Sequence, residues 1–232
     1  VLTYSTDRAG GSFKKRIRKN YSRDYRYFRK TLFDKINTVD KGIVLSSPYL
    51  INNTNSRKLM DSIFDRNLEL KAYTNSLAAT DAIYVSANLY SDIKKWTKRG
   101  LKLYLHDGTY TQTDGIIDEE VKTAKWGTHS KTHIYNFIDE NESEVMIGTY
   151  NIDNRSNYYN SEMAIFCKGN TDLIEEVTES IENRIKDGFE VHSDYSATDR
   201  HGNDVNVYGA DESNLFLMKI ISIPSWLLKF LM

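Results

Sequence analysis

A histidine and a lysine stand two positions apart at His129 and Lys131. On an extended strand, residues two apart leave the same face, so both side chains would project together. An imidazole can attack phosphorus, leave again and carry a proton near neutral pH, while a lysine ammonium can hold the non-bridging oxygens of a phosphate. The pair therefore predicts a site that breaks a P–O bond through histidine, and this chemistry requires neither a metal nor a cofactor.

Two polar segments further along the chain could complete this site; they contribute Thr149, Asn151, Asn160 and Glu162. Asn151 could donate its amide and Thr149 its hydroxyl to the phosphate oxygens, with Asn160 beside them on the substrate side. Glu162 could hold the other ring nitrogen of His129 and fix its tautomer, as the third member of a triad does. A histidine–lysine pair alone is more often an exposed pair on an edge strand, but the two later segments favour a phosphate site.

His133 and Cys167 are not expected to take part in this chemistry. Four residues of strand separate His133 from His129 by about 13 Å, whereas two nitrogens on one zinc ion lie within roughly 4 Å of each other. We expect His133 to line the pocket or to pack beside Tyr135. Cys167 is the only cysteine, so this sequence holds no intrachain disulfide and fits a reducing compartment.

Apolar periodicity predicts the elements that position these residues. The expected strands are 42–47, 68–73, 101–105, 129–137, 145–148 and 161–167, and the expected helices are 21–37, 55–64, 81–98, 116–124 and 171–186. The strand–helix–strand–helix–strand order at the start implies right-handed crossovers. We therefore predict an α/β fold with a mixed, largely parallel sheet flanked by helices.

Composition divides the chain into three parts. The 232 residues are 40% hydrophobic and 27% charged, with a net charge of −1, which is ordinary for a soluble domain. Residues 1–40 are expected to form a basic arm and a helix, 41–190 the α/β domain that carries the predicted site, and 191–232 a surface loop and an apolar helical tail. The arm holds ten Lys or Arg and one acid between Arg8 and Lys30. The tail is marginal as a membrane span and fits an interfacial helix pair or a helix that completes the core.

The three motifs together resemble the second half of a phospholipase D (PLD) superfamily enzyme. These motifs are His129-x-Lys131, Gly148-Thr-x-Asn151 and Asn160-x-Glu162. Longer segments are similar to the C-terminal half of bacterial cardiolipin synthases of the C type, namely Ser47-Pro-Tyr49, 74–81 and 148–156. The resemblance covers 42–186 and implies that His129 is nucleophile or general acid, that Lys131 and Asn151 bind phosphate, and that Glu162 orients His129.

The sequence departs from the family pattern in two places. Asn136 stands where the H-x-K-x4-D motif has an aspartate, and on a regular strand it would face away from His129 and Lys131. A second H-x-K motif, which enzymes of this type carry, is not found in the 232 residues. Because the sequence begins at Val1 rather than at methionine, we expect the missing half to lie upstream, and a second copy of the chain is the alternative.

The resemblance implies phosphatidyl transfer or hydrolysis through a phosphohistidine intermediate. The implied partners are a phospholipid such as phosphatidylglycerol, the membrane surface, and an N-terminal half of the same protein or a homodimer partner, with nucleic acid not expected. The implied location is the bacterial cytoplasm, peripherally on the inner membrane. Two alternatives stay open: a PLD-type nuclease or phosphodiesterase whose basic arm follows nucleic acid, and a catalytically degenerate, membrane-associated scaffold.

Overall fold

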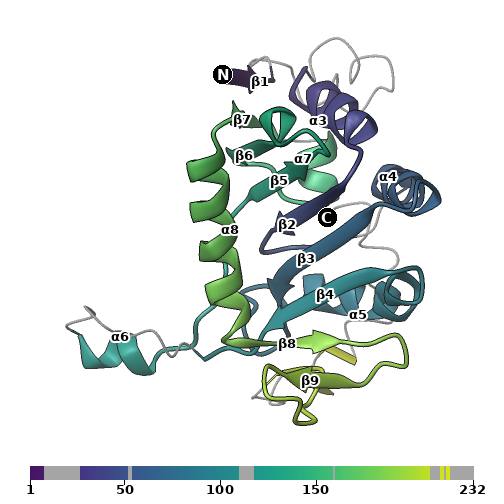
Figure 1. Ribbon diagram of the computed structural model, residues 1–232. Coiled ribbons are helices and arrows are strands. Elements are labelled where there is room, and N and C mark those ends of the chain that lie inside the picture. Colours follow the sequence, from purple (N-terminus) through teal and green to yellow (C-terminus); the bar gives the residue numbers. More distant parts are fainter. Residues whose placement is uncertain are drawn as a thin grey trace.

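The computed structural model describes residues 1–7, 27–51, 54–109, 118–158, 160–209, 215–216 and 218–219. Its strands are β1 (Leu2–Thr6), β2 (Gly42–Ser46), β3 (Glu69–Asn75), β4 (Leu101–His106), β5 (Thr132–Asn136), β6 (Glu144–Gly148), β7 (Met163–Lys168), β8 (Gly188–Val191) and β9 (Ala197–Asp199). Within this part of the chain they form one sheet in the order β1-β7-β6-β5-β2-β3-β4-β8-β9 (Figure 1).

Pairing within the described sheet is parallel at its centre and antiparallel on both sides. β2 pairs with β3, and β3 with β4, in parallel, because a helical crossover joins each of these strands to the next. The other six pairings are antiparallel, beginning with the hairpin of β5 and β6. The predicted mixed α/β class is confirmed, but parallel pairs do not make up most of the sheet.

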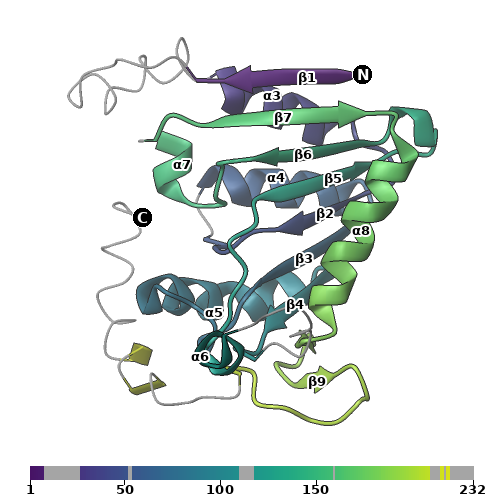
Figure 2. The same ribbon diagram turned by 90° about the vertical axis from the view of Figure 1, so that its left-hand side faces the viewer.

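Helices cover both faces of the sheet. They are α3 (Tyr27–Thr38), α4 (Thr54–Asp65), α5 (Ile83–Thr97), α6 (Glu119–Thr123), α7 (Asn154–Tyr158) and α8 (Thr171–Ile185), with a short 3-10 turn at Glu140–Glu142. Helix α8 lies on one face, and α3, α4 and α5 lie on the other (Figures 1 and 2). The five helices expected from the sequence are all present, although the part of the first that falls on 21–26 lies outside the described residues.

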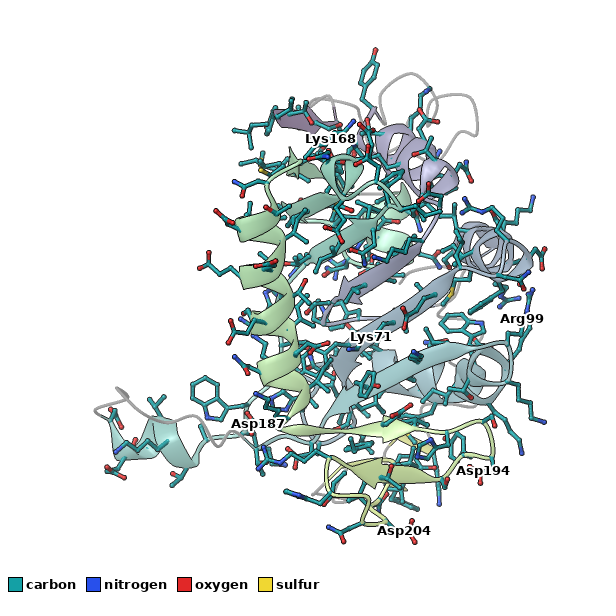
Figure 3. All side chains as sticks on the ribbon, in the orientation of Figure 1. Lys71, Arg99, Lys168, Asp187, Asp194 and Asp204 are labelled. Carbon is teal, nitrogen blue, oxygen red and sulfur yellow. The ribbon has the colours of Figure 1, made fainter. Side chains whose placement is uncertain are left out.

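The side chains of β5 alternate between the two faces, as a strand requires. Ile134 packs under α8 with Tyr73, while Tyr135 belongs to the larger core beneath α3 and α4. On the α8 face, Lys71 of β3 donates to Glu182 of α8 at 2.8 Å (Figure 3). The sheet is therefore anchored on both sides, which makes its strand ends a rigid platform.

The strand ends that carry the polar motifs meet at one edge of the sheet. Ser46, the last residue of β2, lies opposite Tyr73 in β3 and opposite Thr132, the first residue of β5. Thr132 in turn faces Ile147 near the end of β6, and β7 begins beside it. Ligands of α/β proteins commonly bind outside the carboxyl ends of the parallel strands, and we call this edge the strand-end edge.

Several sequence expectations concern residues at the two ends of the chain. The strands β1, β8 and β9, which lie at the two sides of the sheet, were not predicted. Most of the basic arm, 8–26, and most of the apolar tail lie outside the described residues. Of the tail, Leu215 packs against the core and Met218 is buried in it. Among the described residues, no helix has both the length and the apolar character needed to cross a membrane.

Candidate active site

A single buried amide holds the backbone that carries the histidine. The side chain of Asn75, the last residue of β3, accepts from Thr128 N at 2.7 Å and donates to Thr128 O at 2.9 Å. The same amide donates to Pro48 O at 3.4 Å. Asn75 therefore fixes both the loop after β2 and the residue immediately before His129. Sequence reasoning placed Asn75 within a family-like motif but did not assign it this role.

Gly127 allows this loop to come close to its neighbour. A Cβ at Gly127 would collide with the backbone oxygen of Ala79 and would lie 3.1 Å from Oδ1 of Asn75. The close approach of two backbones requires a residue without a side chain. The position of His129 therefore depends on packing between the β3–α5 loop and the segment before β5.

His129 and Lys131 lie side by side at the strand-end edge. Nζ of Lys131 is 3.2 Å from Nδ1 and 3.4 Å from Nε2 of His129, and it donates to the backbone oxygen of His129 at 3.0 Å. Both residues precede β5, which begins at Thr132, so they lie in an extended approach to the strand and not in the strand itself. The imidazole is exposed and Lys131 is half-buried, which leaves the ring open to a ligand.

Glu162 lies behind this pair with only 2% of its surface exposed. Burial raises the pKa of Glu162, and hydrogen bonds from Thr149, Ser156 and Asn160 oppose that rise. The bond from the Thr149 hydroxyl ends on Oε2 of the carboxylate. Among the described residues, the hydrogen-bond partners of this carboxylate do not include the imidazole of His129, although Glu162 is close enough to Lys131 to favour its charged form.

The turn after β6 presents Thr149 and Asn151 to the same edge. Gly148 makes the turn possible, because a Cβ there would collide with Met163 O and lie 2.6 Å from the Cβ of Ala164. The backbone amide of Asn151 donates to the Ser156 hydroxyl at 3.1 Å. The side-chain Oδ1 of Asn151 is buried without a hydrogen-bond partner in the described structure. An unpaired buried polar atom costs about 1–3 kcal/mol, which a bound ligand can offset.

Three carboxylates act on the ammonium of Lys131. Partial burial lowers the pKa of Lys131, and the negative charges of Glu162, Asp153 and Asp81 oppose that fall. Asp153 is buried and caps α7 by accepting from Ser156 N at 2.7 Å. Burial raises the pKa of Asp153 to about 6, so this carboxyl titrates near neutral pH.

His133 lies in β5, two residues after Lys131. Its Nδ1 is 3.0 Å from the Tyr135 hydroxyl, and the two rings meet edge-on. The predicted packing of His133 beside Tyr135 is therefore confirmed. The side chain lines an apolar cavity between α3, α4 and the sheet, and its Nε2 has no partner in the described structure. Asn136 ends β5 at the opposite end from Lys131, so the residue that replaces the motif aspartate lies away from the pair.

Burial of His133 makes folding sensitive to acid. Burial lowers the pKa of His133 to about 3, whereas an unfolded histidine binds a proton near pH 6.5. Between these values the unfolded state binds one more proton, so the free energy of unfolding falls by about 1.4 kcal/mol per pH unit as pH decreases. We expect His133→Gln to remove this contribution in urea unfolding between about pH 6.5 and 4.5.

The comparison with the parent isolates His133 from other groups. Asp153, whose pKa is raised in the fold, adds a slope of opposite sign between its ordinary value of 3.8 and about 6. Both chains contain Asp153, so the difference between their curves reports His133. Parallel curves for parent and variant would contradict the prediction, and the exposed His201→Gln serves as the control.

The structure brings the sequence-predicted residues to one edge. His129, Lys131, Thr149, Asn151, Asn160 and Glu162 all lie in the loops or strand starts of the strand-end edge. Sequence reasoning missed Asn75 and Asp153. No group of three or more His, Cys, Asp or Glu in the described part of the chain is arranged to hold a metal ion.

Comparison with known sequences gives matches that include the motif region. The family model described as "Cardiolipin synthase, PLD-like domain" matches residues 32–185. Over 140 residues, 59% of this chain, the sequence is 26% identical to an uncharacterized protein of Helicobacter pylori (strain ATCC 700392 / 26695). Over 142 residues, 60% of the chain, it is 28% identical to cardiolipin synthase C of Escherichia coli (strain K12). The matched regions span 26% and 29% of these two relatives.

Two solved structures share the fold. Nuc, a phospholipase D family member from Salmonella typhimurium, superposes with a TM-score of 0.54 at 15% identity, over 83% of this chain and all of that one. Phosphatidylserine synthase from Haemophilus influenzae Rd KW20 superposes with a TM-score of 0.59 at 11% identity, over all of this chain and 47% of that one. At such identities the likeness concerns the fold alone.

Proposed function

Because the chain belongs to the family of cardiolipin synthase PLD-like domains, we propose that it acts on phospholipid phosphodiesters, by phosphatidyl transfer or hydrolysis through a phosphohistidine. The observation that carries this proposal is the contact between Nζ of Lys131 and the exposed imidazole of His129. A nucleophilic ring next to a cation, at the edge where ligands of α/β sheets bind, suits attack on a phosphodiester.

The reaction proceeds in two steps that exchange one P–O bond for another. A histidine nitrogen attacks phosphorus, an N–P bond forms, and the P–O bond to the leaving alcohol breaks. A second histidine, protonated at the start, gives its proton to the leaving oxygen. It then takes a proton from the hydroxyl of the acceptor alcohol or water, whose oxygen attacks phosphorus while the N–P bond breaks. His129 serves as the nucleophile or as the acid in this pair.

The surrounding side chains bind and position the phosphate. The ammonium of Lys131 and the amide of Asn151 hold its non-bridging oxygens, with Thr149 and Asn160 beside them. Glu162 supports the site by anchoring Thr149 and Asn160 and by keeping Lys131 charged. The buried, unpaired Oδ1 of Asn151 supports this role, because amide nitrogen and oxygen exchange places when the group turns by 180°.

The second histidine comes from another half-site. Glu162, Asp153 and Asp81 all act on the single ammonium of Lys131, so the negative charge that develops on the phosphate oxygens in the transition state needs further positive charge. We assign that charge to a second H-x-K pair, supplied by an N-terminal half of the same protein or by a second copy of the chain. The lengths of the sequence relatives leave room for an N-terminal half, because the matched regions span 26% and 29% of them.

The substrate also sets the location. We propose that the protein works peripherally on the cytoplasmic side of the bacterial inner membrane, where a phospholipid substrate is available. The ten basic residues between Arg8 and Lys30 would favour an anionic surface by about 1 kcal/mol each when near it.

The test uses the protein in its full natural length with vesicles of phosphatidylglycerol. We expect lipid mass analysis to find cardiolipin or phosphatidic acid, and to find little of either with His129→Ala. Degradation of plain DNA without any lipid product would instead favour a nuclease. Absence of turnover on both substrates would favour a scaffold.

Loss of the Asn75 amide should misplace the histidine. Asn75→Ala leaves the polar backbone groups of Thr128 and Pro48 unpaired, so we expect a loss of about 1–3 kcal/mol in the free energy of unfolding. A shift of about 1 Å at a reacting group can cost about 10²-fold, and we expect kcat to fall by that order. Thr74→Val is the matched control, because this neighbouring hydroxyl is buried without a partner in the described structure. Parental kcat in Asn75→Ala would contradict the positioning role.

A further inference from the structure

A tyrosine–aspartate pair, Tyr49 and Asp81, lies at the strand-end edge, and no role in binding substrate has been assigned to it above. The hydroxyl of Tyr49, in the loop after β2, is 2.9 Å from Oδ1 and 3.0 Å from Oδ2 of Asp81. Asp81 lies in the loop between β3 and α5, and its side chain is exposed. Both loops leave the carboxyl ends of parallel strands, where His129 also lies.

The amide of Asn75 connects this pair to the histidine. It donates to Pro48 O and to Thr128 O, so Tyr49 and His129 each follow a residue that the same side chain holds. Asp81 also interacts electrostatically with Lys131. The Tyr49–Asp81 pair therefore lies beside the proposed phosphate site.

The charge of Asp81 limits what it can bind. A carboxylate repels the phosphate that Lys131 would hold, and it accepts hydrogen bonds but donates none when ionised. Tyr49 donates its single hydroxyl proton to Asp81, and this exposed carboxylate can accept further hydrogen bonds. A suitable ligand next to the phosphate must therefore bring its own donors, as hydroxyl and ammonium groups do.

Resting on the function proposed above, we propose that Asp81, oriented by Tyr49, selects the phospholipid headgroup by accepting hydrogen bonds from its hydroxyl or ammonium group. Tyr84 lies near Tyr49 and is 40% exposed, so it adds an aromatic surface beside the Tyr49–Asp81 pair. Asp81 is then a specificity residue, and Tyr49 a positioning residue that acts through it.

The experiment compares three donor lipids in the full-length protein. Phosphatidylglycerol brings hydroxyls, phosphatidylethanolamine brings an ammonium, and phosphatidylmethanol brings no headgroup donor. We expect Asp81→Asn to lower the ratio of kcat/KM for one of the first two lipids over that for phosphatidylmethanol by about 10-fold or more, because hydrogen bonds to charged groups are the strong ones. A fall for phosphatidylglycerol identifies a hydroxyl, and a fall for phosphatidylethanolamine identifies an ammonium.

Two further variants separate selection from structure. Tyr49→Phe should lower the same ratio by a smaller factor, because the carboxylate loses its orienting donor. Asp172→Asn, at an exposed aspartate in the first turn of α8, should leave the ratio unchanged. Equal losses on all three lipids in Asp81→Asn and Tyr49→Phe would overturn the headgroup role. Failure of the parent on all three would overturn the proposed function itself.

Discussion

His129→Ala is expected to lower phospholipid turnover by at least about 10³-fold. An imidazole that attacks phosphorus or protonates the leaving alcohol acts in the transition state, so the loss should fall on kcat with little change in KM. The rate of lipid product formation at saturating phosphatidylglycerol, compared between the variant and the parent, measures this loss. The matched control is His201→Ala, whose imidazole is exposed and bonded to Arg200. A His129→Ala variant that keeps a tenth or more of parental kcat would exclude His129 from the chemistry.

Imidazole in solution distinguishes lost chemistry from lost folding. His129 is exposed, so its removal opens a space that reaches solvent. Added imidazole should therefore restore part of the turnover of His129→Ala, and it should have no such effect on Asn75→Ala, where the ring is present but misplaced.

Lys131→Met is expected to lower kcat/KM by about 10²–10³-fold, the usual cost of removing one donor from a site of developing negative charge. Both kcat and KM should worsen, because the ammonium binds the phosphate in the ground state as well as in the transition state. Lys131→Arg should recover part of the loss, since it keeps the charge with a different geometry. The control is Lys102→Met, which changes an exposed lysine of β4 that pairs with Glu69 of β3. Equal effects of Lys131→Met and Lys102→Met would contradict a specific phosphate contact.

The same lysine should set the alkaline limit of activity. Burial lowers the pKa of Lys131, so its charge, and with it the turnover, should disappear at a lower pH than for an ordinary lysine. Arginine stays charged over the whole range, so Lys131→Arg should not show this decline. A pH–rate profile of the two proteins measures the difference.

The central elements of the fold could be predicted because their signals are local. The apolar runs of β2, β3 and β4 and the helical periodicity of α4 and α5 are visible in short windows of sequence. Strand β1 gives no such signal, because four of its five residues are exposed and it exists through pairing with β7, more than 150 residues away. Strand β8 joins the sheet by antiparallel pairing with β4, which precedes it by more than 80 residues, and this pairing is not visible in a short window either. Such antiparallel pairings explain why the expectation of a largely parallel sheet failed.

In the candidate site, too, the features set by local sequence could be predicted, and those set by distant contacts could not. Spacing alone placed His129 beside Lys131, because two residues of extended chain fix their common face. The role of Asn75 could not be predicted, since it depends on which loops meet β3 in space. The partners of Glu162 also depend on the fold, because the turn after β6 brings the Thr149 hydroxyl onto its carboxylate.

The central physical claim is that the imidazole of His129 and the ammonium of Lys131 share one anion site. Inorganic phosphate, added to the chain while the ring signals of its histidines are followed by NMR, tests this without a second half-site. His129→Ala assigns the signal. We expect phosphate to shift the His129 ring in the parent and in Lys102→Met, and the shift to vanish in Lys131→Met. An unmoved His129 signal, or equal phosphate binding without Lys131, would contradict the account.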